Sequence, residues 1–118
     1  MKHLNNKRKL NLKPAHRKAL LRNQVIHFIT HGHLTTTLAH VKEVRRLAER
    51  LVTIAAKGND FNAVRKVKSM IPYSTDAQVK LFTEIAPTYV SRPGGYTRIL
   101  KLGRRVSDTA SVARLQWV

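Results

Sequence analysis

The chain has 118 residues, which suits one domain with a modest hydrophobic core but not two. Its 23 Lys and Arg residues outnumber 6 Asp and Glu, and the formal net charge of +17 exceeds what solubility requires, so a polyanionic partner such as nucleic acid is indicated. The absence of cysteine excludes disulfides and thiol catalysis, and no apolar run approaches the ~20 residues of a membrane span.

Residues 1–13 show no stable hydrophobic period, and we predict a basic extended arm there. They lack the apolar stretch and small-residue cleavage site of a secretory signal. They are basic and acid-free, as mitochondrial transit peptides are, but contain no serine, so we expect an arm of the mature protein. No acidic residue precedes Glu43, and such a block avoids compaction unless a partner neutralises it.

A first helix is predicted over Pro14–His31. Proline suits the first turn, because its missing N–H has no partner to lose there. Apolar side chains from Leu21 to Phe28 recur at helical spacing, and Gly32 suits the C-terminal cap. The threonine-rich stretch 33–37 then favours a brief strand.

Three further helices are expected before the chain changes character. The first of them has a clean apolar stripe formed by Val41, Val44, Ala48, Leu51 and Ala55. The three are predicted to run from a cap at Thr36 or Thr37 to near Lys57-Gly58, from a cap at Asn59 or Asp60 through Phe61 to about Met70, and from a cap at Ser74 or Thr75 to Pro87.

Strands are predicted after Pro87. Residues 96–102 are β-prone, and residues 111–118 alternate between apolar and polar side chains. The connection at 103–109 is too long for a two-residue turn. We therefore predict an α+β fold, a two-layer α/β arrangement in which a basic N-terminal arm (1–13) precedes a single domain (14–118) of helix–strand–three helices–two strands, with the helices packed on one face of a small sheet.

Few residues are placed to carry catalysis. Six carboxylates are scattered, and the two on one helix, Glu43 and Glu49, lie among Lys and Arg, so we expect ion pairs on a solvated face. His27 and His31 lie one helical turn apart, a metal-ligand spacing, but no acidic residue lies nearby to complete a metal shell. No glycine-rich nucleotide-binding motif occurs. We predict that the chain is not an enzyme and has no catalytic site, metal site or cofactor.

Basic side chains recur along the whole chain. Each run alone fits a solvated face, but together with the acid-free arm they predict phosphate contacts at many points. DNA-binding proteins usually concentrate positive charge on one recognition helix. Here the positive charge is expected to surround the fold, which is typical of a protein placed among several RNA segments. The aromatic content of 6% disfavours a base-stacking platform. The runs are Lys42, Arg45, Arg46 and Arg50; Arg65, Lys66 and Lys68; and Arg92, Arg98, Lys101, Arg104 and Arg105.

A glycine pair, Gly94-Gly95, lies within the last of these runs. Glycine has no Cβ and tolerates positive φ, so the pair suits a tight entry into a strand starting at Tyr96 and a close approach of RNA to the backbone. A turn without RNA contact is the alternative, and the residues leave both open.

Several segments, in order along the chain, resemble the bacterial large-subunit ribosomal proteins of the L-seventeen family. The most specific is the string Gly94–Leu100 joined to the threonine-rich segment that precedes Lys42-Glu43. The segments are Met1–His3, Lys9–Asn11, His16–Leu20 with Arg22-Asn23, His31-Gly32, Thr35–Thr37 with Lys42-Glu43 and Arg45, Lys80–Phe82 with Ile85–Pro87, and Gly94–Leu100.

The resemblance implies a structural constituent of the large ribosomal subunit that binds large-subunit rRNA through Lys and Arg contacts to phosphate and supports subunit assembly and translation in the cytoplasm. It implies neighbouring large-subunit ribosomal proteins as partners, and no membrane, small-molecule substrate or obligate homo-oligomer. A free basic DNA-binding or nucleoid protein and a small RNA-acting enzyme are the alternatives. The residues predicted to contact RNA are Lys2, His3, Lys7, Arg8, Lys9, Arg17, Arg22, Arg92, Gly94, Gly95, Tyr96, Arg98, Lys101, Arg104 and Arg105.

Overall fold

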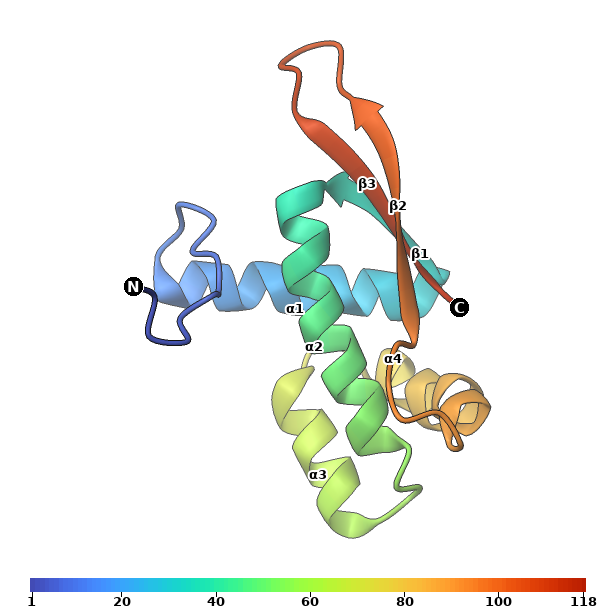
Figure 1. The fold of residues 1–118 in the computed structure, drawn as a ribbon. Helices are drawn as coiled ribbons and strands as arrows, with labels where there is room; N and C mark the ends of the chain where they lie inside the picture. The colour runs from blue at the N-terminus through green and yellow to red at the C-terminus, as the bar shows by residue number, and fades with distance from the viewer.

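The computed structural model describes residues 1–118 and has the predicted order of elements (Figure 1). This order confirms the α+β fold class. None of the helices is both long and apolar enough to cross a membrane. The elements are α1 (Pro14–His31), β1 (His33–Thr37), α2 (Leu38–Ala55), α3 (Phe61–Met70), α4 (Thr75–Lys80), the irregular helical turns η1 (Leu81–Ile85) and η2 (Ala86–Tyr89), β2 (Thr97–Arg104) and β3 (Ser111–Trp117).

Helix α1 has the predicted ends. Pro14 is its first residue, and the Gly32 N–H donates to the Phe28 carbonyl at 2.8 Å. Gly32 has a φ of 80°, the left-handed conformation that glycine adopts without a Cβ penalty. This cap turns the chain directly into β1, so the C-terminal end of α1 lies against the sheet.

The residues predicted to cap the other three helices occupy the cap positions, but only one of them makes a capping hydrogen bond. The Ser74 hydroxyl accepts a hydrogen bond from the Ala77 N–H at 3.2 Å. Thr37 and Asp60 occupy the cap positions of α2 and α3, but neither side chain makes a capping hydrogen bond. Helix α2 also ends at Ala55, slightly before the predicted end, and the Gly58 N–H closes a turn onto the Ala55 carbonyl at 3.0 Å.

The prediction that the fourth helix closes at Pro87 was wrong. The chain widens into a π-helical turn at Leu81–Ile85 and then tightens into a 3-10 turn that reaches Tyr89. A proline inside an α-helix removes one hydrogen bond and clashes with the carbonyl four residues earlier. The wide turn before Pro87 and its position in the first turn of η2 fit this constraint, so the helical path bends instead of stopping.

The sheet has three antiparallel strands in the order β1-β3-β2. Strand β2 runs to Arg104, beyond the predicted end at residue 102, because a register shift between Lys101 and Gly103 lets pairing continue to Ser111. The loop is therefore 105–110 and not 103–109. The β2–β3 hairpin projects away from the helices (Figure 1).

Helix α2 lies at the centre of the molecule and packs against all three strands. Its predicted apolar stripe is buried, and it joins the inward residues Leu34, Ala113 and Leu115 of the sheet. The same hydrophobic cluster continues into α3 and α4–η1 through Val67, Ile71 and Leu81. One core therefore holds the sheet and all the helices together.

Residues 1–13 contain no helix or strand and form turns beside the start of α1 (Figure 1). The Asn5 N–H donates to the Lys2 carbonyl at 3.0 Å, and the Leu12 N–H donates to the Lys9 carbonyl at 3.2 Å. The division into an arm (1–13) and a domain (14–118) stays a prediction.

Candidate nucleic-acid interface

A basic groove lies between the N-terminal segment, α2 and the edge strand β2. Helical spacing places the three basic residues of α2 that line it within about one turn of one another. The groove has a volume of about 430 Å³ and contains a single carboxylate. Its lining residues are Arg8, Lys42, Arg45, Arg46, Glu49 and Ile99.

An ion-pair cluster beside this groove holds the N-terminal segment on α2. The Arg8 guanidinium lies 3.1 Å from one carboxylate oxygen of Glu43, and that of Arg46 lies 4.0 Å from the other. Arg46 also donates to the backbone and side-chain oxygens of Asn6, both at 3.3 Å. Glu43 is only 6% exposed, so the expectation of a solvated face was wrong for this residue, because the N-terminal segment covers it.

The second acidic residue of α2, Glu49, fastens the start of β2. Its Oε1 accepts hydrogen bonds from the Thr97 hydroxyl at 2.7 Å and from the Thr97 N–H at 3.3 Å. The Arg45 Nε donates to the same oxygen at 3.4 Å. Both carboxylates of α2 therefore hold other segments of the chain against this helix, whereas Lys42 beside them has no acidic partner.

Two neighbouring grooves extend this basic surface along α2. One of about 220 Å³ shares Arg46 with the first groove, and another of about 440 Å³ shares Arg50 with that one. We call the charged residues of the three grooves other than Glu43 and Glu49 the α2 basic face. Its members are Lys7, Arg8, Lys18, Arg22, Lys42, Arg45, Arg46 and Arg50.

Two predicted contact residues on α1 have partners within the protein. Arg22 donates to the Ser69 carbonyl at 3.2 Å and to the Tyr73 hydroxyl at 3.4 Å, and so links α1 to the end of α3. Arg17 donates to the carbonyls of Leu12 and Lys9 at 3.3 and 3.5 Å. These arginines position backbone segments, whereas the side chains of the remaining predicted residues of the N-terminal segment, Lys2, His3, Lys7 and Lys9, are exposed.

The glycine pair lies in the loop between η2 and β2. Gly95 has a φ of 64°, and a Cβ there would meet no atom of the chain within 4 Å, so the space beside it is open. Tyr96, by contrast, is 3% exposed, and its hydroxyl donates to the Arg92 carbonyl at 3.3 Å. The ring of Tyr96 is thus a core group, while Arg92 packs over the Tyr89 ring at 5.3 Å and stays exposed.

The hairpin carries four exposed predicted residues, Arg98, Lys101, Arg104 and Arg105. The Arg105 guanidinium donates two hydrogen bonds, of 2.8 and 3.0 Å, to the Asp108 carboxylate. The hydrogen bond from Arg105, with another from the Ala110 N–H, lowers the pKa of Asp108 to about 2. The ion pair between Arg105 and Asp108 therefore stabilises the tip of the hairpin.

The predicted contact residues thus fall into three places and not one. The structure brings Arg8 together with the basic residues of α2, but the glycine loop and the hairpin lie apart from them (Figure 1). Arg98 points to the side of the sheet opposite α2. The set of predicted contact residues omitted the four basic residues of α2, although they form one of the basic runs for which the sequence predicts phosphate contacts. That omitted group is Lys42, Arg45, Arg46 and Arg50.

The histidines at the C-terminal end of α1 form a small cluster. The rings of His27 and His31 lie 4.4 Å apart, centroid to centroid. Burial, followed by the charges of His31 and His33, lowers the pKa of His27. No group of three His, Asp or Glu residues in the chain has the geometry of a metal site.

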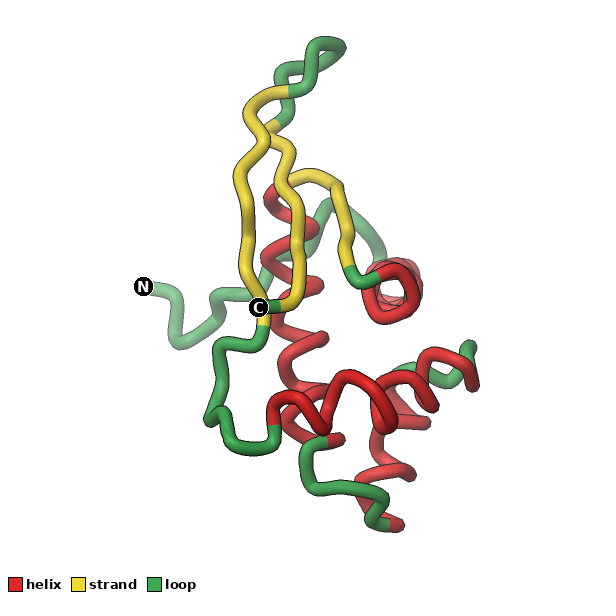
Figure 2. The backbone as a smooth tube through the Cα atoms, turned by 90° about the vertical axis from the view of Figure 1, so that its right-hand side faces the viewer, coloured by secondary structure: helices red, strands yellow, loops and turns green.

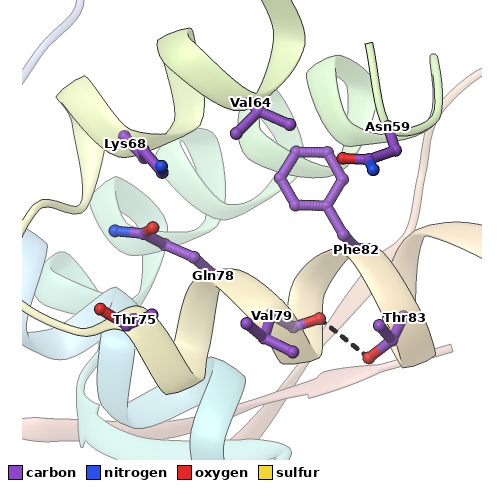
Figure 3. Close-up of a pocket in the computed structure, with 8 residues that line it drawn as sticks. All are labelled: Asn59, Val64, Lys68, Thr75, Gln78, Val79, Phe82 and Thr83. Atoms are coloured by element: carbon purple, nitrogen blue, oxygen red, sulfur yellow. Dashed lines mark hydrogen bonds between the residues drawn. The ribbon is translucent and has the colours of Figure 1, made fainter. Parts of the chain in front are cut away.

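A different kind of groove separates α3 from α4–η1 (Figure 3). Its volume is about 410 Å³, and Val64, Val79 and Phe82 supply its apolar lining. The Thr83 hydroxyl donates back to the Val79 carbonyl at 2.8 Å, and Gln78 donates to the Ile71 carbonyl at 2.8 Å. The lining holds one charged group, that of Lys68, and no carboxylate or imidazole, so it offers no acid–base pair.

Known proteins resemble the chain along nearly its whole length. The profile of the family described as "Ribosomal protein L17" matches residues 20–118. The "Large ribosomal subunit protein bL17" of Halothermothrix orenii is 50% identical over 113 residues, 94% of this chain and 96% of that protein. The proteins of the same name from Clostridium kluyveri and Agrobacterium fabrum are 46% and 45% identical, over 94% and 100% of this chain and 96% and 82% of their own lengths. The chain therefore belongs to the ribosomal protein L17 family.

Proposed function

We propose that this chain is a structural constituent of the large ribosomal subunit that binds large-subunit rRNA through many contacts between Lys or Arg and phosphate. The observation that carries the proposal is family membership over almost the full length, with relatives named as large-subunit proteins. Its partners are rRNA and other ribosomal proteins, and its location is the cytoplasmic large subunit. Family membership also supports the prediction that the chain is not an enzyme.

The charge distribution supports binding through the RNA backbone. Each Lys or Arg placed on a phosphate releases condensed counterions, and this gain does not depend on base sequence. The α2 basic face offers such side chains from three parts of the chain that are far apart in sequence. The glycine loop and the hairpin add further exposed arginines at separate positions, so several RNA segments can be held at once.

The placement of the aromatic residues supports the same mode of binding. The exposed aromatic side chains are Phe61 and Tyr73, at 75% and 61% exposure, and both lie on or beside α3. Tyr73 meets one member of the α2 basic face, Arg22, which donates to its hydroxyl, and no exposed Phe, Tyr or Trp ring accompanies the glycine loop or the hairpin. Base stacking therefore contributes little in the proposed interface, and contacts to phosphate and ribose dominate.

The proposed contact set contains all the basic residues predicted from the sequence, including Arg17 and Arg22, together with those of α2. Gly94 and Gly95 are included for close approach of the RNA backbone, and Tyr96 acts by fixing the loop that carries them. The basic members are Lys2, His3, Lys7, Arg8, Lys9, Arg17, Arg22, Lys42, Arg45, Arg46, Arg50, Arg92, Arg98, Lys101, Arg104 and Arg105.

Sucrose-gradient fractionation of cells that express a tagged full-length chain tests the proposal. We expect the protein to sediment with large subunits and to stay bound in moderate salt, because many phosphate contacts act together. Ribonuclease digestion of the same fractions is expected to release it. Recovery only in the soluble pool, or a higher affinity for duplex DNA than for folded large-subunit rRNA fragments, would contradict the proposal.

A further inference from the structure

The sheet has one face that no helix covers. Side chains of successive strand residues point to opposite faces, and the buried residues Leu34, Ala113 and Leu115 identify the face toward α2. In Figure 2 the strands lie in front of α2, and no helix crosses their near side. We call this uncovered side the open sheet face.

The strand register determines which side chains share the open sheet face. His33 of β1 is opposite Gln116 of β3, which is opposite Arg98 of β2. The next outward row places Arg114 of the central strand β3 between two neighbours on the outer strands. Across the two rows the residues are His33, Gln116 and Arg98, then Thr35, Arg114 and Leu100.

The charges on this face have no counter-charge within the protein. The ion pairs of the chain involve Arg8, Arg45, Arg46 and Arg105, so neither Arg98 nor Arg114 belongs to one. The two rows contain no Asp or Glu. An anion on the open sheet face would therefore meet two guanidinium groups that are diagonal neighbours on adjacent strands.

Arg114 is the group that most needs an external acceptor. It lies on the central strand and is partly buried, and its Nε has no hydrogen-bond acceptor in the protein although that atom is shielded from solvent. Buried polar groups are normally hydrogen-bonded, and a charged donor is the costliest to leave unpaired. Thr35, Gln116 and His33 surround it with further groups that can bond phosphate or ribose oxygens.

We propose that the open sheet face is a further RNA-backbone site, in which Arg114 and Arg98 bind phosphate and Thr35, Gln116 and His33 contact phosphate or ribose. The proposal rests on the proposed function, because it takes rRNA as the polyanion. It adds a surface that lies on the opposite side of the sheet from α2 and its basic face. The two rows contain no Phe, Tyr or Trp, and this favours the backbone over stacked bases.

The first test measures binding of the full chain to a large-subunit rRNA transcript across a series of salt concentrations. Arg114→Gln is expected to lower the salt slope by about 0.8 and the affinity at 0.1 M salt roughly sixfold, as for one lost phosphate contact. Arg114→Lys, which keeps the charge, is expected to keep the slope. The matched control is Lys66→Gln on α3, which removes one exposed charge and is expected to bind like the unmodified chain.

The outcomes separate this inference from the function on which it rests. Failure of the unmodified chain to bind rRNA would overturn both. Normal binding by the unmodified chain together with an unchanged slope for Arg114→Gln would overturn only the open sheet face as a site. Circular dichroism of each variant is expected to match the unmodified chain.

A second measurement does not depend on the folding of an Arg114 variant. The chain contains no cysteine, so Thr35→Cys provides a single attachment point for a photo-crosslinker on the open sheet face. In assembled large subunits we expect the reagent to crosslink to rRNA. Val79→Cys, exposed on α4, is the position-matched comparison. Crosslinks from Thr35→Cys to protein alone, or none at all, would overturn the proposal.

Discussion

Two regions of the molecule share one core but differ sharply in charge. Residues 59–90, which we call the neutral region, contain α3, α4, η1 and η2 and carry four basic and three acidic side chains. The rest of the chain, the basic region, carries 19 Lys and Arg against three carboxylates. The expectation that charge surrounds the fold is therefore wrong for one end of the molecule, where the neutral region lies (Figure 1).

The carboxylates of the two regions also behave differently. All three in the basic region, Glu43, Glu49 and Asp108, are paired with arginines. None of the three in the neutral region takes part in an ion pair. The neutral region also holds both exposed aromatic side chains and the apolar groove of Figure 3. We therefore expect the basic region to bind the rRNA backbone and the neutral region to have no role in phosphate binding.

The largest expected effect tests whether the two regions form one folding unit. Ile71 is fully buried in the neutral region and belongs to the same cluster as the core of α2. Ile71→Ala should lower the free energy of unfolding by about 2–5 kcal/mol, because it removes buried methylene groups and leaves a cavity. Thermal unfolding followed by circular dichroism measures the change.

The single tryptophan reports on the basic region. Trp117 lies at the other end of the core, where its ring stacks on Phe28 at 4.3 Å. Its fluorescence should therefore report the same lowered midpoint as circular dichroism. A tryptophan midpoint that stays at the unmodified value while the helical signal melts earlier would show that the two regions unfold as independent units.

The next effect concerns charge alone. Lys42→Gln with Arg45→Gln removes two positive charges from the α2 basic face, and Arg65→Gln with Lys66→Gln removes two from α3. We expect the first pair to lower the salt slope of rRNA binding by about 1.5 and the affinity at 0.1 M salt roughly 30-fold. We expect the second pair to leave both nearly unchanged. Equal losses from the two pairs would show that net charge, and not its placement, governs binding.

Much of this fold follows from local sequence signals. The limits of α1 follow from Pro14 and Gly32, and the burial of α2 follows from its apolar stripe. The π-helical turn before Pro87 was not predictable by these rules, because they treat proline as a stop and do not weigh the packing of Leu81 and Ile85 that favours a continued helix. The strand limit at Arg104 depends on a bulge that forms only when β3 pairs with β2.

The candidate site was predictable in kind but not in arrangement. Composition alone indicated a polyanionic partner, and the exposed residues of the N-terminal segment followed from its lack of apolar period. The burial of Glu43 depends on Arg8, which lies 35 residues away in sequence, and local patterns do not report such contacts. Tyr96 was predicted at the RNA surface because of its neighbours, whereas its ring fills the core beside Tyr89 at 5.2 Å.

The smallest expected effect concerns the tip of the hairpin, where the pairing of carboxylates in the basic region can be followed directly. The hydrogen bond from Arg105 lowers the pKa of Asp108 from 3.8 to about 2. A carboxylate whose pKa is lower in the folded state stabilises that state at pH values above its unfolded-state pKa. This contribution is lost as the pH falls from about 4 through about 2. Both side chains are exposed to solvent. We therefore expect the Arg105–Asp108 pair to order the hairpin tip but to contribute little to the global stability of the fold.

An NMR titration of the Asp108 side-chain carboxyl measures this effect. Arg105→Gln should return the pKa of Asp108 toward 3.8, because it removes the main hydrogen-bond donor. Arg104→Gln is the matched control, because it removes the adjacent guanidinium group, which donates to the Thr109 carbonyl and not to Asp108. This variant should leave the pKa of Asp108 near 2. If the Asp108 carboxyl of the unmodified chain titrates with its ordinary pKa, this carboxylate is not paired with Arg105. In the pairing of its carboxylates, the basic region would then differ from the neutral region only at Glu43 and Glu49.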